Sequence, residues 1–138
     1  MSFLLDTNIL SELRKGRRCD PRVMRWAATA EAELHTSVLA LGELKLGIEL
    51  VRSRDPRFAG ELERWLTRLI LVMGRQILPV DQAVALEWGR IGALRTVPPI
   101  DGLLAATALV HGLTVVTRNI NDFAELGVSY LDPFDPIH

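Results

Sequence analysis

The order of segments along the chain predicts an α/β protein with a central, mainly parallel sheet of four or five strands. Short apolar runs alternate with longer segments in which apolar residues recur at helical spacing. Asp-Pro pairs, or a single Asp or Ser, precede several of the longer segments, as helix caps do. This alternation favours parallel strands joined by right-handed crossovers, because a helix can pack back onto the sheet between consecutive strands.

Five segments have the character of strands. The first, Phe3-Leu4-Leu5, is short and wholly apolar, as a buried strand is. The second covers Glu33 to Thr36. Ile77-Leu78-Pro79-Val80 is expected near an edge of the sheet, because Pro has no N–H to donate to a neighbouring strand. Two final strands are expected at residues 113–117 and 128–131.

Helices are expected between these strands. The first covers residues 9–14, and Asp20-Pro21 opens the next, which runs through Trp26. Ser37 caps a third helix. Asp55-Pro56 breaks the chain before a fourth, whose stripe from Phe58 to Ile70 is wide for a small core and is a candidate for burial against a second subunit or a partner.

Two further helices and a short turn of helix follow. Asp81 caps a helix that runs to about Arg95. Pro98-Pro99 stops the chain, which restarts at Ile100-Asp101 as a helix that Gly112 closes. That helix is apolar all round and is therefore expected at the centre of the fold. A short helix is expected at residues 123–126.

Length and composition indicate one globular domain over residues 1–138. The chain is 49% hydrophobic and 24% charged, which excludes a disordered protein. Cys19 is the single cysteine, so an internal disulfide and a cysteine-rich zinc site are excluded. No apolar run is long enough to span a bilayer, and the start of the chain lacks the pattern of a signal peptide. These features are typical of a cytoplasmic protein.

Net charge does not indicate a nucleic-acid-binding protein, because it is only −1. The cations are nevertheless unevenly placed. Arg14-Lys15-Gly16-Arg17-Arg18 follows soon after Asp6 and is close enough to line a substrate path beside it. Arginine suits phosphate recognition, although a GC-rich genome would produce the same preference for Arg over Lys.

Four acids stand where a strand-and-helix protein has little use for them: Asp6, Glu43, Asp101 and Asp122. Asp6 ends the first strand, Glu43 interrupts an apolar helix face, Asp101 opens the most apolar helix, and Asp122 follows the strand at 113–117. Ligands of open α/β sheets bind beyond the carboxyl ends of the strands, where these acids can converge. Converging carboxylates repel one another unless they share a cation. The pattern therefore indicates a Mg²⁺ or Mn²⁺ site and phosphate chemistry.

Each acid also has a structural interpretation. Asp6, Asp101 and Asp122 are acceptable helix caps. Glu43 is harder to explain in this way, because its helical neighbours are apolar and an unpaired buried carboxylate is costly. Glu12 and Glu49 are expected to be ordinary surface acids. Four unrelated caps need not share one sheet edge, whereas metal ligands must.

Four motifs occur in order along the chain: Leu5-Asp6-Thr7-Asn8-Ile9-Leu10-Ser11, Glu43 followed by Gly47, Asp101-Gly102-Leu103-Leu104-Ala105-Ala106-Thr107-Ala108, and Val116-Thr117-Arg118-Asn119-Ile120-Asn121-Asp122-Phe123. Together they closely resemble the motifs of PIN-domain proteins, in particular the VapC-type toxins of bacterial toxin–antitoxin pairs. The resemblance covers essentially the whole chain.

The resemblance implies a three-layer α/β/α fold and a Mg²⁺- or Mn²⁺-dependent endoribonuclease that hydrolyses RNA. It also implies a homodimer or higher assembly and a cognate VapB-type antitoxin that holds the enzyme inactive. By position, Asp6, Glu43 and Asp101 are the core catalytic, metal-binding acids and Asp122 is the fourth. The residues that match the polar support around them are Thr7, Asn8, Thr117 and Asn119. Arg118 is expected either to contact phosphate or, as we favour, to form a salt bridge with Asp122.

Other functions fit the sequence less well. A phosphatase with an Asp nucleophile would have a second Asp where Asn8 stands, and a phospho-receiver domain would have a Lys late in the chain, but none follows Lys45. The alternative that remains is a catalytically silent PIN module that only binds a partner or represses its own operon. Such a module would be expected to have lost one of the acids. Trp26, Trp65 and Trp88 lie on apolar helix stripes, which favours core packing or a subunit interface over base stacking.

Overall fold

The computed structural model describes residues 1–30 and 33–135. These residues form a five-stranded sheet in the order β3-β2-β1-β4-β5, in which every neighbouring pair is parallel. The strands are β1 (Phe3–Leu5), β2 (Leu34–Ser37), β3 (Ile77–Leu78), β4 (Thr114–Val116) and β5 (Tyr130–Leu131). The predicted parallel α/β sheet is confirmed. The edge position of β3 is also confirmed, and the strand ends just before Pro79.

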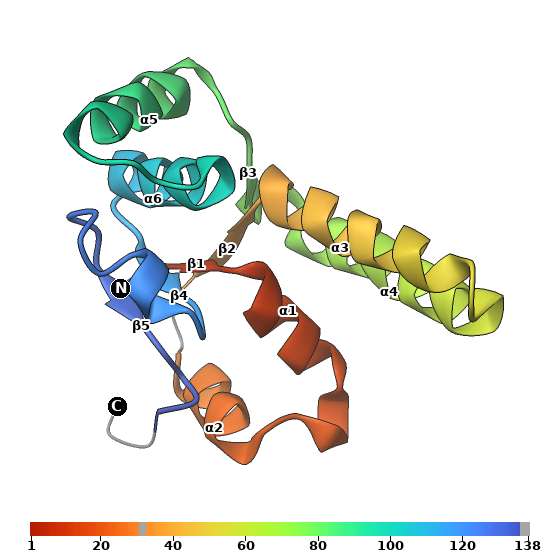
Figure 1. Cartoon of the computed structure of the whole chain (residues 1–138). Helices are drawn as coiled ribbons and strands as arrows, with labels where there is room; N and C mark the ends of the chain where they lie inside the picture. Colours follow the sequence, from red (N-terminus) through yellow and green to blue (C-terminus); the bar gives the residue numbers. More distant parts are fainter. Residues whose placement is uncertain (31–32, 136–138) are drawn as a thin grey trace.

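Helices cover both faces of the sheet, which confirms the three-layer α/β/α architecture (Figure 1). One face is packed by α1 (Thr7–Arg14), α2 (Pro21–Thr29), α3 (Val38–Arg52) and α4 (Pro56–Met73). The other face is packed by α5 (Gln82–Leu94) and α6 (Pro99–His111). Short 3₁₀ turns occur at η1 (Gly16–Arg18), η2 (Gly74–Gln76) and η3 (Ile120–Asp122).

The pleat of β1 divides the core between the two layers. Phe3 and Leu5 face the α1–α4 side, and Leu4 faces the α5–α6 side, because successive side chains of a strand point to opposite faces. The neighbouring strand β4 repeats the division with Val116 and Val115. β1 is therefore buried on both faces, and its carboxyl end carries Asp6 to the middle of one sheet edge.

Helix starts follow the predicted caps. Asp20, Ser37, Asp55 and Asp81 each accept a backbone hydrogen bond in the first turn of α2, α3, α4 and α5. Gly112 ends α6 in the left-handed conformation, with φ of 67°.

The strands β2 to β5 differ by one or two residues from their predicted ranges, and the helices differ from those predicted in four places. α1 begins at Thr7, two residues before the predicted start, and α2 continues past Trp26 to Thr29. α6 begins at Pro99 because a proline is acceptable in the first turn of a helix. The predicted helix at 123–126 is wrong, since residues 123–127 form a turn.

No single helix in the described parts of the chain is long and apolar enough to cross a membrane. α5 and α6 reach that length and hydropathy only when they are added together across a 119° bend.

Candidate active site

Asp6 lies where β1 ends and α1 begins, and only 9% of the residue is exposed. Its Oδ1 accepts a hydrogen bond from the Thr7 backbone N–H at 2.7 Å, so the residue is the N-cap of α1. Its Oδ2 accepts a hydrogen bond from the Thr117 hydroxyl at 2.9 Å. The Asn8 side-chain amide also donates to Oδ2, at 3.5 Å, so the carboxylate is held at both oxygens.

Glu43 meets the same group of residues from α3. Its Oε1 accepts a hydrogen bond from the Thr7 hydroxyl at 2.6 Å, which ties α3 to the first turn of α1. The predicted burial of its helix face is only partly correct. Ala40 is buried, but Leu46 and Leu50 are 61% and 65% exposed. Glu43 therefore lies at the margin of the core, half-buried, where an ionised carboxylate can keep contact with water.

The loop after β4 is fastened to α1 through Asn8. The Asn8 side-chain amide donates to the Thr117 hydroxyl at 3.4 Å, and its carbonyl oxygen accepts from the Arg118 backbone N–H at 3.2 Å. The Thr117 hydroxyl also accepts from the Asn119 backbone N–H at 3.0 Å. The polar residues expected to surround the acids therefore form one connected network beside Asp6.

Burial is the main cause that raises the pKa of both Asp6 and Asp101. For Asp6, hydrogen bonds from Thr117 and Thr7 oppose this shift, and repulsion from Glu43 and Asp122 adds to it. For Asp101, repulsion from Asp122, Asp6 and Glu43 adds to the effect of burial. Carboxylates influence one another in this way only when they are close. The fold therefore brings all four acids to one edge of the sheet.

Asp101 and Asp122 are not helix caps. The N-cap position of α6 is Pro98, and Asp101 is the third residue of the helix. There its charge is favoured by the helix dipole. Asp122 ends η3 and is followed by a turn, so the helix that it was considered to cap does not exist. Among the four acids, only Asp6 combines a capping hydrogen bond with membership of the cluster.

Two predictions about charged residues are wrong. The described residues contain no Arg118–Asp122 salt bridge; the Arg118 guanidinium lies over the Phe134 ring, 4.4 Å from its centroid. The Arg118 backbone N–H donates to the Asn8 side chain, and its aromatic partner Phe134 lies in the segment that follows β5. Glu12 is 8% exposed, and its carboxylate accepts hydrogen bonds from the Asp20 backbone N–H and from Lys15.

The donor atoms at this edge are of one chemical kind. Asp6, Glu43, Asp101 and Asp122 offer only carboxylate oxygens, which suit hard divalent cations. Among residues 1–30 and 33–135, no group of three or more Asp, Glu, His or Cys side chains is arranged to hold a metal ion. The acids are close enough to repel one another, but they are not drawn together around a single point.

Sequence reasoning missed Ser11, which lines a cleft beside Thr7 and Glu43. Ser11 lies four residues after Thr7, so it stands on the same face of α1. This spacing is visible in the sequence and would have been enough to find it.

The comparison that decides the family is a match between the profile of the PIN domain and residues 3–128. This chain belongs to the PIN-domain family. Among VapC-type PIN proteins, it is similar to the VapC ribonuclease Y4jK of Sinorhizobium fredii, with 28% identity over 97% of this chain and 99% of that one.

Two solved structures extend the likeness of this PIN domain to three dimensions. FitAcB from Neisseria gonorrhoeae superposes with a TM-score of 0.83 and 31% identity, and the match covers 96% of this chain and 98% of that one. A toxin–antitoxin complex from Klebsiella pneumoniae superposes with a TM-score of 0.69 and 25% identity, again over 96% and 98%. The PIN fold therefore extends over nearly the whole chain.

Proposed function

We propose that this PIN domain, acting over residues 1–138, is a Mg²⁺- or Mn²⁺-dependent endoribonuclease toxin that a cognate VapB-type antitoxin neutralises. The observation that carries the proposal is that Asp6 and Glu43 are joined through Thr7 at one sheet edge, where the charges of Asp6, Glu43 and Asp122 raise the pKa of Asp101. Clustered like charges destabilise the folded state, and a shared cation offsets their repulsion. The similarity to a VapC ribonuclease supports RNA as the substrate.

Asp6, Glu43 and Asp101 are proposed as the residues that hold the metal, with Asp122 as a fourth, peripheral acid. Mg²⁺ keeps several of its waters and binds through one or two carboxylates together with substrate phosphate. Four carboxylates that do not surround a single point are compatible with an ion that keeps several of its waters. A bound Mg²⁺ or Mn²⁺ would supply a Lewis acid that activates water and offsets charge on the phosphate.

The surrounding residues orient these acids. The hydroxyls of Thr7 and Thr117 donate to Glu43 and Asp6, so each carboxylate keeps one fixed lone-pair direction. Asn8 holds the loop that carries Thr117 against α1. In this proposal Thr7, Asn8, Thr117 and Asn119 position the catalytic carboxylates, and Arg118 fixes the path of the loop through its backbone N–H.

The experiment is RNA cleavage by the purified chain after its antitoxin has been removed. We expect cleavage of cellular RNA with Mg²⁺ or Mn²⁺ and none in EDTA. Asp6→Asn and Asp101→Asn should each lower the rate by about two orders of magnitude or more, because each removes an anionic ligand from the site. Asp55→Asn is the matched control, since it makes the same change at an exposed cap of α4. Full activity in EDTA would contradict the metal-dependent mechanism.

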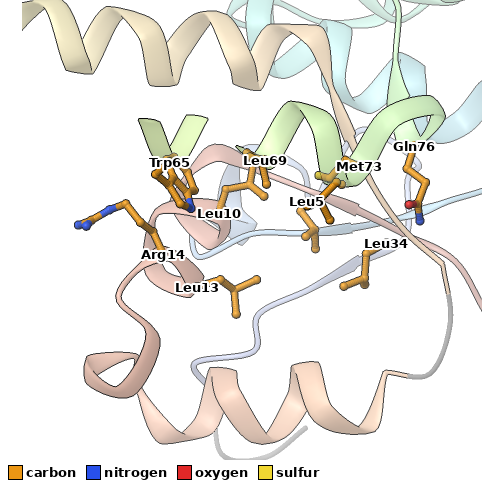
Figure 2. Close-up of a pocket in the computed structure, with 10 residues that line it drawn as sticks. Leu5, Leu10, Leu13, Arg14, Leu34, Trp65, Leu69, Met73 and Gln76 are labelled. Atoms are coloured by element: carbon orange, nitrogen blue, oxygen red, sulfur yellow. The ribbon is translucent and has the colours of Figure 1, made fainter. Parts of the chain in front are cut away.

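An apolar groove of about 440 Å³, lined mainly by residues of α1 and α4, offers a place for the antitoxin. Figure 2 shows Trp65, Leu69 and Met73 of α4 facing Leu10 and Leu13 of α1. The floor is completed by Leu5 of β1 and Leu34 of β2. We propose that an apolar segment of the antitoxin fills this groove and reaches the acids with an Arg that replaces the metal. The solved toxin–antitoxin complex of a related fold supports a protein occupant.

Growth of cells that express the chain tests this partner. Co-expression of the neighbouring antitoxin gene should relieve growth arrest. Met73→Glu should abolish the relief, because it places a charge inside the groove. Leu86→Glu is the matched control, since Leu86 is 69% exposed on α5 and lies outside the groove. Equal arrest with and without the antitoxin gene would show that the partner has been wrongly assigned.

A further inference from the structure

A second cleft, of about 250 Å³, opens beside the acids between α1, α3 and α4. The hydrogen-bonded pair of Thr7 and Glu43 lies at one end of it. Ser11 and Arg14 continue the wall along α1, because residues four and three apart follow one helix face. The cleft therefore leads from the carboxylates, past a hydroxyl, to a cation.

The walls that α3 and α4 form are mainly apolar. On α3, Gly47 and Val51 follow Glu43 along one face. No atom lies within 4 Å of the place where a Cβ of Gly47 would stand, so the missing side chain leaves the cleft open next to Glu43. On α4, Phe58 and Trp65 present aromatic rings to the same space.

Arg14 is presented to this cleft as an available cation. Its guanidinium lies over the Phe58 ring, 5.7 Å from the centroid. None of the salt bridges formed within the described residues uses Arg14. A guanidinium held against an aromatic face keeps its N–H edge for an anion, and its planar fork matches a phosphate.

We propose that this cleft is a subsite for single-stranded RNA in which Arg14 binds a phosphate that flanks the cleavage site. The inference rests on the proposed ribonuclease function and adds where the strand lies. Arg14 is about 10 Å along the axis of α1 from Thr7, at 1.5 Å per residue. Thr7 and Arg14 stand two turns of α1 apart, which leaves room at Arg14 for a second phosphate of the same strand. The apolar wall that Phe58 and Trp65 form offers contact for a sugar or the edge of a base.

Charge complementarity distinguishes this cleft from the groove assigned to the antitoxin. The groove is lined almost entirely by apolar side chains, which suits a protein segment. The cleft joins a carboxylate, two hydroxyls and a guanidinium to an apolar wall, which suits a nucleotide. The two spaces meet at Arg14 and Trp65, so an antitoxin in the groove would also obstruct the RNA path.

The test measures binding of a short fluorescein-labelled single-stranded RNA of mixed sequence to the full chain in EDTA, by anisotropy. Arg14→Gln should weaken binding about tenfold, because it removes one charge-assisted contact. It should also reduce the slope of log K against log salt by about 0.7, the change expected for one phosphate contact on a single strand. Arg25→Gln removes the same charge from an exposed position on α2, which does not line the cleft, and should change neither quantity.

A second variant tests whether the cleft must be open for RNA to bind. Gly47→Leu should block the cleft beside Glu43 and weaken RNA binding. It should not destabilise the protein, because Leu is a better helix former than Gly. Gly89→Leu is its control, since Gly89 lies on α5 with nothing within 4 Å of its Cβ position.

The outcomes separate this inference from the proposed function. An unchanged affinity and salt slope in Arg14→Gln overturn the subsite even if the wild-type chain cleaves RNA. Loss of antitoxin binding in Arg14→Gln with RNA binding intact assigns the cleft to the antitoxin and also overturns it. A chain that binds RNA through Arg14 but does not cleave it with Mg²⁺ or Mn²⁺ supports the subsite and contradicts the ribonuclease.

Discussion

At the junction of β1 and α1, a single carboxylate has both a structural and an electrostatic role. Oδ1 of Asp6 caps α1, and Oδ2 faces Thr117 within reach of the other acids. The two roles respond differently to substitution. Asn caps a helix as well as Asp does, but it carries no charge. Asp6→Asn therefore removes the repulsion and keeps the cap.

We expect metal-free Asp6→Asn to melt a few degrees above wild type in EDTA at pH 7, because ionised Asp6 is disfavoured by burial and by Glu43 and Asp122. The direction of the pKa shift of Asp6 also predicts how the stability of the protein depends on pH. A carboxyl whose pKa is raised in the fold contributes stability that is present at low pH and is lost as pH rises through that pKa. Lowering the pH from 7 toward about 5 should therefore raise the melting temperature of wild type more than that of the variant.

The acids whose pKa is lowered in the fold do not change the melting temperature over this pH range. Hydrogen bonds from Asp20 and Lys15 lower the pKa of Glu12 from 4.5, and Arg52 and Lys45 lower that of Glu49 to about 2. Their contributions to stability are lost only as the solution becomes more acidic than their ordinary pKa. A variant that melts below wild type in EDTA, with no difference in pH response, would show that Asp6 acts as a cap alone.

At the scale of the elements, the sequence predicts helix starts well, because a cap is a local event. Asp20, Ser37, Asp55 and Asp81 each hydrogen-bond to a residue two or three positions later, so a short stretch of sequence contains both partners. The parallel direction of the strands follows from their alternation with helices. The fold class could therefore be predicted before any coordinates were known.

Contacts between elements are harder to predict. Glu12 is buried because η1 returns the chain so that the Asp20 N–H, eight residues later, reaches its carboxylate. Nothing in the spacing of apolar residues indicates that return. The predicted Arg118–Asp122 salt bridge is wrong for the same reason, because the aromatic partner of Arg118, Phe134, lies in the segment after β5. The approach of Asp6 to the loop after β4 could be predicted because neighbouring parallel strands place their carboxyl ends together. The role of the four acids as metal ligands stays a prediction.

On the scale of the whole molecule, exposed apolar side chains mark surfaces that the isolated chain leaves uncovered. Leu46 and Leu50 on α3 and Leu71 and Val72 on α4 are each more than 60% exposed. The stripe from Phe58 to Ile70 is partly covered by the core, and these two end residues are 36% and 42% exposed. Assembly as a homodimer remains a prediction. Patches of this kind are typical of surfaces that bind other proteins.

The stability of the whole molecule should depend on the metal, because a ligand that binds only the folded state stabilises it by mass action. At a concentration of one hundred times the dissociation constant the gain is about 2.7 kcal/mol, which corresponds to a rise of several degrees in Tm for a domain of this size. We expect Mg²⁺ in the millimolar range to raise the Tm of wild type by this order.

The same titration separates specific binding from a general salt effect. Asp6→Asn should show a much smaller rise with Mg²⁺, because one of the proposed ligands has lost its charge. Asp55→Asn should respond as wild type does, since its carboxylate caps α4 away from the other acids. Equal shifts in all three proteins would mean that Mg²⁺ acts on the general surface charge. No shift in wild type would mean that the clustered acids repel one another without binding the ion. In the expected case, the carboxylates that destabilise the metal-free fold are the groups through which Mg²⁺ stabilises the whole protein.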